Sequence, residues 1–347
     1  MKINIRLATA MLLVGSCNFS YAETAISPIC SRKSEPAGLP SAPPPAKKLV
    51  ASDASTNVAK AALHLVYSIE NGLPDPYVAV TGNFDGQGLS LGLIQFNFGG
   101  AAQKAFSKIP HEVYVRTMPK YGELFYKAVH ASPPRSSIQM VTEMQTVTGR
   151  AWRVNQDAKS ELKAFLGSSE ARSAQDHAVA TEYYQPAYSR ARQWAAARGS
   201  IKPSPREIAT FIDNQVFSGG FLGGIWIEQA KAFRASFDND GKMIAFVSQW
   251  LLSCPYSGPV FLWGQKDAQR SAEAWTKAYP VGSTLSEERA LLFAFGFLRA
   301  LTANGPKGQP EQSGIFKAQV VERRGLIALG VGTANGIKWP GGILDQD

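Results

Sequence analysis

Two carboxylate residues, Glu70 and Asp85, lie 15 positions apart in the first third of the chain. Glu70 ends an apolar segment that starts at Asn57, and Asp85 lies inside the glycine-rich stretch GNFDGQGLSLGLIQFNFGG. Acid/base cleavage of a glycosidic bond uses two carboxyl groups, separated by about 5 Å for retention or about 6.5–9.5 Å for inversion. The two residue types and their spacing therefore suggest carboxylate chemistry on a sugar chain.

The segment that ends at Glu70 has the periodicity of an amphipathic helix. Its apolar residues recur at helical spacing, at Val58, Ala61, Ala62, Leu65, Val66 and Ile69. Thr56 or Asn57 provides an N-cap, and Gly72 and Pro74 prevent the helix from continuing. Glu70 is therefore expected in the last turn, where the negative end of the helix dipole disfavours a carboxylate. If apolar neighbours also desolvate it, both effects favour the protonated form, which can act as a general acid near pH 7.

A β-hairpin is expected to follow this helix. Tyr77 to Val80 is a β-prone run, Asp85-Gly86 is a turn signal, and Leu89 to Ile94 is apolar again. Such a hairpin brings Asp85 back beside Glu70. The residues alone leave a second interpretation open, in which Glu70 is a solvated helix end and Asp85 serves only the turn.

The segments SIENG, from Ser68, and TGNFDGQGLSLGLIQFN, from Thr81, resemble the lysozyme-like superfamily. The resemblance is to the branch that holds the chitosanases and related bacterial wall-associated proteins. It is specific over Glu70 to Gly100, and it extends in outline to Ile208–Gly220 and Arg323–Gly336. The resemblance implies a mainly α, two-lobed lysozyme-like domain with a small β-hairpin beside the catalytic cleft.

The same resemblance implies roles for individual residues. Glu70 would be the general acid, Asp85 the base or water-positioning carboxylate, and Ser90, Gln95 and Asn97 would be polar groups of the cleft. Lytic transglycosylases of the superfamily also pair a glutamate with an S-x-G-x-x-Q segment and work without a second carboxylate. The separation of Glu70 and Asp85 is close to typical chitosanase spacing but differs from it, so the two mechanisms remain alternatives.

The amino terminus has the pattern of an export signal. Lys2 and Arg6 precede an apolar core from Leu7 to Gly15, and Ser20-Tyr21-Ala22 offers a cleavage site. The protein is therefore expected to be exported, to the periplasm or the medium. VGSC, ending at Cys17, also resembles a bacterial lipobox and would leave a lipid-anchored Cys17, although glycine and serine are not the preferred residues there. No later stretch reaches about 20 apolar residues, so no transmembrane segment is expected in the mature chain.

The charge of the chain bears on its partner. Removal of residues 1–22 takes away two positive charges and no negative one, so the formal net charge falls from +9 to +7. A basic surface favours anionic peptidoglycan over the polycationic substrate of a chitosanase. Nucleic acid is not expected as a partner, because no basic run is interleaved with aromatic residues. The expected partner is peptidoglycan or a related amino-sugar polymer, with a chitosanase or a catalytically inactive glycan-binding protein as alternatives.

Cleavage at Ala22 leaves two cysteines, Cys30 and Cys254, which permit one disulfide in an oxidising compartment. Two unpaired thiols are the alternative.

Residues 23–50 are rich in proline and small residues, which predicts an extended tail. Residues 51–347 are long enough for one large domain. Helices are expected at 100–106, 137–148, 157–166, 176–197, 205–217, 225–237, 242–252 and 286–303.

Other patterns with chemical meaning also fit structural roles. Gly88-Leu89-Ser90-Leu91-Gly92 matches a serine nucleophile elbow, but the strands and helices expected before such an elbow are missing. The four histidines, His64, His111, His130 and His177, are scattered and predict packing or surface positions. Neither a metal nor a cofactor is expected.

Asp213-Asn214 falls at a helix end, where a solvated position is favoured over one lining the cleft opposite Glu70. Asp238-Asn239-Asp240-Gly241 resembles a calcium loop, but position 12 is Gln249, so a turn is expected. Gly219-Gly220 with Gly223-Gly224 lacks the lysine of a phosphate loop. The seven tryptophans are expected mostly in the core, with one or two able to stack on sugar rings.

Overall fold

Helix α1 (Asn57–Asn71) spans the predicted apolar segment and ends one residue after Glu70. Its inner face is fully buried at Ala62, Val66 and Ile69, while His64 on the opposite face is exposed. In this computed structural model, the described residues are 29–30, 57–71, 74–83, 86–148, 151–218, 227–254, 262–303, 313–339 and 344. The expected signal sequence, Cys17, the tail up to residue 50 except residues 29–30, Asp85 and Gly219–Gly224 lie outside them.

A short 3-10 helix and a small sheet follow α1. The helix η1 (Pro76–Val78) precedes an antiparallel sheet of β1 (Val80–Thr81), β2 (Ser90–Leu91) and β3 (Phe96–Asn97), in the order β1-β2-β3. The prediction of a strand over Tyr77–Val80 is wrong except at its last residue. Pro76 occupies the start of the turn and the Asp75 carboxylate accepts a hydrogen bond from the Tyr77 amide at 3.2 Å, and both favour the helical turn.

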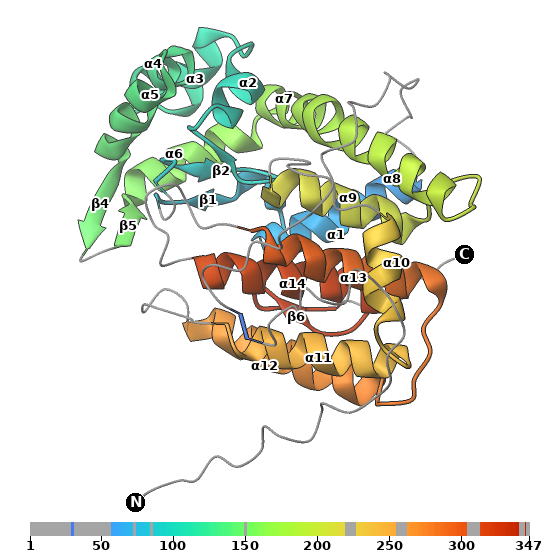
Figure 1. Cartoon of the computed structure of the whole chain (residues 1–347). Helices are drawn as coiled ribbons and strands as arrows, with labels where there is room; N and C mark the ends of the chain where they lie inside the picture. Colours follow the sequence, from blue (N-terminus) through green and yellow to red (C-terminus); the bar gives the residue numbers. More distant parts are fainter. Residues whose placement is uncertain are drawn as a thin grey trace, which may run out of the picture.

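The remainder of the first lobe is mainly helical (Figure 1). Its aromatic core joins Phe106, Tyr114, Phe125 and Phe165, with ring centroids 4.7–5.9 Å apart. The helices and the hairpin β4–β5 are α2 (Ala101–Phe106), α3 (His111–Thr117), α4 (Gly122–His130), α5 (Pro134–Met140), η2 (Val141–Met144), β4 (Gln145–Thr148), β5 (Ala151–Val154), α6 (Gln156–Gly167) and α7 (Ser169–Ala178).

The helix predicted over 137–148 is therefore only partly present. It breaks into α5 and η2, and the chain then becomes β4 at Gln145. Thr146, Val147 and Thr148 are all β-branched, and the facing strand carries Trp152 and Val154, so β propensity and cross-strand pairing override the helical spacing.

A long interrupted helix joins the two lobes. Helix α7 continues through a π-helical turn, η3 (Val179–Tyr184), into α8 (Gln185–Ala197). Pro186 has no amide hydrogen for the carbonyl of Glu182, four residues earlier, and its ring would crowd that carbonyl. The Gln215 side chain donates to this carbonyl at 3.4 Å, so the widened turn has a local cause and a side-chain partner.

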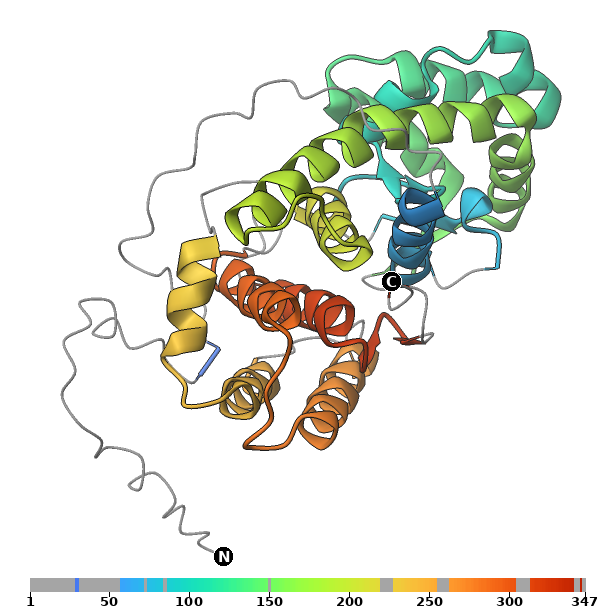
Figure 2. The same ribbon diagram turned by 90° about the vertical axis from the view of Figure 1, so that its right-hand side faces the viewer.

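The second lobe packs helices around a central buried helix (Figure 2). Its elements are α9 (Pro205–Ser218), α10 (Ile227–Ala235), α11 (Asp240–Leu252), α12 (Leu262–Ala278), α13 (Glu287–Leu301), α14 (Ser313–Leu329), β6 (Thr333–Ala334) and β7 (Ile337–Lys338). Every residue of α13 from Ala290 to Leu301 is buried. A Cβ on Gly296 would lie 2.7 Å from the Arg324 Cβ, so glycine there permits the close approach of α13 and α14.

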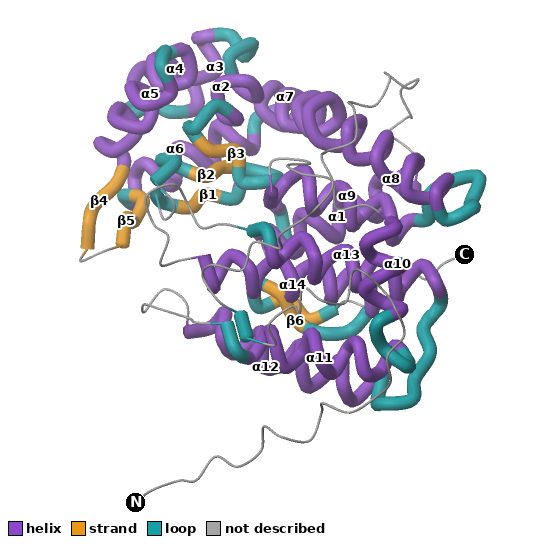
Figure 3. Tube along the Cα trace, viewed as in Figure 1, coloured by secondary structure: helices purple, strands orange, loops and turns teal. Residues whose placement is uncertain are grey.

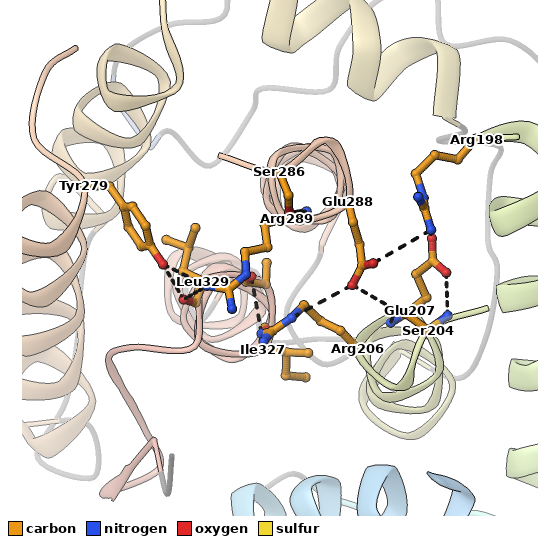
Figure 4. A network of polar contacts seen from close by, with 11 residues as sticks. Arg198, Ser204, Arg206, Glu207, Tyr279, Ser286, Glu288, Arg289, Ile327 and Leu329 are labelled. Carbon is orange, nitrogen blue, oxygen red and sulfur yellow. Dashed lines mark hydrogen bonds and ion pairs between the residues drawn. The ribbon is translucent and has the colours of Figure 1, made fainter. Parts of the chain in front are cut away.

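A polar network fixes where α14 ends against its neighbours (Figure 4). Arg206 donates to the carbonyls of Ile327 and Ala328, while Arg289 and Tyr279 donate to the carbonyl of Leu329 at 3.2 and 2.9 Å. Arginines at a helix C-terminus satisfy its free carbonyls and complement its dipole. The network positions α14 against α9. On α9, Asp213 follows Glu207 by about 9 Å along the helix axis, at a rise of 1.5 Å per residue.

In the same network, Glu207 is fully buried. Its carboxylate accepts from Arg198 at 2.9 Å and from the Ser204 amide at 2.8 Å. Burial raises the pKa of Glu207, and the hydrogen bond from Arg198 opposes that rise. These contacts join the start of α9 to the preceding helix α8.

The fold class predicted from the sequence is confirmed at the level of secondary structure: the chain is mostly helical, with small antiparallel sheets (Figure 3). Cys30 and Cys254 form a disulfide with a Cα–Cα distance of 4.7 Å, which attaches the amino-terminal segment to the end of α11. No helix in the described ranges is long and apolar enough to cross a bilayer.

Candidate active site

Glu70 lies at the junction of three helices from distant parts of the chain. Its Oε1 accepts a hydrogen bond from Nη2 of Arg323, on α14, at 2.5 Å. Arg323 in turn donates to Oδ1 of Asp213, on α9, at 2.8 Å from Nε and 2.6 Å from Nη2. The Arg323 guanidinium also stacks 4.6 Å from the centroid of the Phe217 ring. Ring and carboxylate together fix its orientation, as is typical of arginine.

A second arginine approaches the same aspartate. Arg324 Nε lies 3.3 Å from Asp213 Oδ2, close enough for an ion pair but not directed for a hydrogen bond. Arg324 Nη2 donates to the Ser218 hydroxyl at 2.8 Å. Burial lowers the pKa of Arg324 to about 9, against the opposing effect of Asp213. Asp213 is therefore held between two buried cations.

Glu70 is the member of this cluster that meets solvent. Its side chain is 12% exposed, whereas the side chains of Asp213 and Arg323 are 0% and 1% exposed. The prediction that favoured a solvated Asp213 is wrong. Asp213 instead lies opposite Glu70, across Arg323.

Burial and two neighbouring charges act on the pKa of Glu70 in opposite directions. Desolvation raises the pKa of Glu70, the charge of Arg323 lowers it, and the charge of Asp213 raises it, with a net rise above its ordinary value. Arg323 makes two hydrogen bonds to Asp213 and one to Glu70. Because Asp213 takes the larger share of this cation, Arg323 offsets only part of the rise in the Glu70 pKa that desolvation causes. A raised pKa on a carboxyl that still reaches solvent is a property of general acids.

The end of α1 is fixed by a turn from the carboxyl-terminal part of the chain. Asn335, between β6 and β7, has a φ of 50°, and its side-chain amide donates to the carbonyl of Ile69 at 2.9 Å. The next amide, of Gly336, donates to Asp267 on α12 at 2.6 Å. The residue before Glu70 is thus tied to the second lobe.

Of the polar residues expected beside the site, Gln95 is half-buried in the turn between β2 and β3, Asn97 is half-buried on β3, and Ser90 is buried. Gln95 has a φ of 57°, and non-glycine residues in this left-handed region often mark functional sites. Asn97 accepts from the Gly99 amide at 3.1 Å. Ser90 pairs with Asn97 in the register of β2 and β3 and is 2% exposed, so it is part of the sheet interior.

Gln175, which sequence reasoning did not single out, holds the turn that leads to Gln95. It is fully buried on α7, and its Oε1 accepts from the Leu93 amide at 3.0 Å. Its amide group donates to the carbonyls of Tyr77 and Leu166 at 3.4 and 3.5 Å. Gly92 has a φ of 68°, and a Cβ there would overlap the Gln175 side chain. This explains the glycine in the S-x-G-x-x-Q segment.

Asp85, the second expected carboxylate, lies outside the described residues, but both sides of its loop are anchored. On one side, the Asn83 amide donates to Gln145 Oε1 on β4 at 2.7 Å. On the other, the Gly88 amide donates to the Asn83 side chain at 3.1 Å. Gln145 also donates to the Val141 carbonyl at 3.1 Å, so both ends of its amide are used.

The alternative sites considered from the sequence have structural roles. Ser90 lies within a strand and not on a strand-to-helix turn, so the serine nucleophile elbow is wrong. Asn239 caps α11, and Asp240, which forms an ion pair with Arg234 at 2.7 Å, begins that helix, so the turn expected over Asp238–Gly241 is present only before Asp240. All four histidines are exposed. Among the described residues no group of three or more ligating side chains is placed to hold a metal ion.

A surface hollow of about 290 Å³ lies between α11 and α12, away from these residues. Its lining includes Leu252, Gln269 and Glu273, and none of the lining residues belongs to the Glu70 cluster. The hollow is therefore not part of the candidate active site.

Comparison with known proteins adds little to this description. No protein-family model matches the chain, and no curated protein matches it. Among solved structures, one described as "Chitosanase complex structure" is similar to this chain, with 21% sequence identity and a TM-score of 0.35. The match covers 58% of this chain and 81% of the other. A TM-score this low supplies no argument about activity, which has to come from the site.

Proposed function

We propose that the protein is an exported glycosidase that cleaves the glycan strand of bacterial peptidoglycan, with Glu70 as general acid. The observation that carries the proposal is the state of Glu70, whose pKa is raised while its side chain keeps a solvent-facing edge. In this mechanism Glu70 protonates the glycosidic oxygen, and the bond to the leaving sugar breaks as positive charge develops on the ring.

Asp85 is proposed as the second carboxylate, which activates water or stabilises that charge. The support is its place in the hairpin segment after Glu70 and the anchoring of its neighbours Asn83 and Gly88. Gln95 and Asn97 are proposed to contact the sugar, and Ser90 to support them from within the sheet. The Cys30–Cys254 disulfide supports export, because disulfides persist in oxidising compartments.

The test is release of soluble fragments from dye-labelled sacculi, with the mature chain and its Glu70→Gln variant. The proposal expects turnover by the wild type and a loss of at least about a hundredfold in the variant, which cannot donate the proton. A variant that folds normally and keeps full activity would refute the role of Glu70. Turnover of soluble chitosan without release from sacculi would reassign the enzyme as a chitosanase, and binding without cleavage would indicate a glycan-binding protein.

A further inference from the structure

The hairpin β4–β5 projects from the first lobe beside the sheet that follows α1 (Figure 1). In its register Gln145 faces Val154, and Val147 faces Trp152. Side chains two positions apart on a strand lie on the same face, so Gln145, Val147, Trp152 and Val154 share one face. Gln145 accepts from the Asn83 amide, which shows that this face turns toward the Gly82–Asn83 segment.

The hairpin and this segment also meet through their backbones. A Cβ on Gly82 would overlap the carbonyl oxygen of Trp152. Glycine at position 82 thus lets β5 lie directly against the end of β1. The face that carries Val147 and Trp152 therefore continues outward from the chain segment that leads to Asp85.

The outer part of this face is apolar and partly exposed. Val147 is 50% exposed and Trp152 is half-buried. Within the described residues, the hydrophobic core includes Val154 among its packed neighbours but neither Val147 nor Trp152. By contrast, Trp194, Trp250 and Trp275 are fully buried. Trp152 is therefore only partly enclosed, unlike these three core tryptophans.

We propose that Trp152 and Val147 form a binding platform for a pyranose ring of the glycan. The apolar face of a sugar ring packs on an indole, and Trp combines a large apolar area with a polar edge. The Gln145 contact fixes the platform relative to the Asp85 loop. This inference rests on the proposed function, because it takes the occupant to be the same glycan strand.

The experiment measures binding without cleavage. The mature Glu70→Gln chain is mixed with purified sacculi, and the bound fraction is found by sedimentation. Adding Trp152→Ala is expected to weaken binding about five- to tenfold, the range that one aromatic contact supplies. Trp152→Phe, which keeps a ring, is expected to retain most of the binding. Thr146→Ser is the matched control, because Thr146 lies on β4, exposed on the opposite face of the hairpin, and serine keeps the hydroxyl that donates to Asn155.

In the active background, Trp152→Ala is expected to raise KM with little change in kcat, which a general loss of folding would not do. Unchanged sacculus binding by Trp152→Ala would overturn the platform while leaving the proposed function intact. If the Glu70→Gln chain binds neither sacculi nor chitosan, the proposed function and the platform both fail. Equal losses in Thr146→Ser and Trp152→Ala would also overturn the platform.

Discussion

Glu70 and Asp213 accept hydrogen bonds from the same nitrogen, Nη2 of Arg323, at 2.5 and 2.6 Å. The two carboxyl groups compete for one buried cation, and Asp213 holds it more firmly through a second bond from Nε. Glu70, which accepts only one bond from Arg323, is the carboxyl group that reaches solvent. In the proposed mechanism Asp213 is therefore a positioning residue that acts on Glu70 through Arg323.

Removal of the Asp213 charge is expected to change the pH dependence of activity. In Asp213→Asn, Arg323 has only Glu70 as an anionic partner, so the pKa of Glu70 falls. The general acid is then lost at lower pH, and the alkaline limb of the pH–rate profile shifts toward acid. The measurement is kcat/KM on labelled sacculi across pH.

Asp240→Asn is the matched control for this prediction. Asp240 is also buried and paired with an arginine, but it lies outside the site. Asp213→Asn is expected to lose about 3 kcal/mol of stability, because it removes the charge that the buried Arg323 and Arg324 share, and Asp240→Asn is expected to lose less, because Arg234 is 27% exposed. An unmoved alkaline limb in Asp213→Asn would contradict the competition described above.

The Glu70 side chain is expected to cost stability as pH rises. Its folded-state pKa lies above the ordinary value of 4.5, so its contribution to stability is present in full below about 4.5 and is lost as pH rises through the folded pKa. Glu70→Gln resembles the protonated form and should be more stable than the wild type near neutral pH, by about 1–2 kcal/mol. The difference should shrink at acid pH.

Denaturant unfolding at several pH values measures this difference. Glu182→Gln, at an exposed position on the π-helical turn, is the control and should change stability little. A Glu70→Gln variant less stable than the wild type near pH 7 would show that the ionised, arginine-paired form of Glu70 dominates in the folded protein.

Gln175 is expected to support both the fold and the site. Gln175→Leu leaves the Leu93 amide and the Tyr77 carbonyl without this side-chain partner inside the protein, which should cost about 2–3 kcal/mol. It should also lower kcat/KM, because the turn that leads to Gln95 loses its anchor. Urea unfolding and sacculus assays measure the two effects. Gln185→Leu, at an exposed position on α8, should change neither.

The disulfide is expected to contribute to stability and little to chemistry. It joins residues separated by 224 positions, and the chain-entropy model gives about 4–5 kcal/mol for closing so long a loop. Thermal unfolding of the Cys30→Ser, Cys254→Ser double variant should begin at a lower temperature than in the wild type. A reductant should lower the wild-type transition and leave that of the double variant in place. An equal effect of reductant on both proteins would contradict a structural role for this bond.

The local part of the site could be predicted from the sequence. The apolar periodicity and the Gly72 and Pro74 stop signals place Glu70 in the last turn of α1, and that is where it lies. The helix over 205–218 was predicted to within one residue, including Asp213 near its end. Both results depend on spacing within a single helix.

The partners of these residues could not be predicted in the same way. Asp213 and Arg323 are 110 positions apart, and Glu70 and Arg323 are 253 apart. Helix α14 itself was not predicted from its periodicity, because it is buried on nearly all sides and has no polar face to mark a period. The only sequence signal for Arg323 was the outline similarity of the segment from Arg323 to Gly336.

The most direct test of Glu70 as general acid is mass spectrometry of the products from purified sacculi, with the mature chain and Glu70→Gln side by side. We predict disaccharide-containing fragments that have gained one water, formed by the wild type and not by the variant. Anhydro-sugar ends would keep Glu70 as the acid but remove Asp85 from the mechanism. The same products at the same rate from a folded Glu70→Gln protein would contradict the central claim.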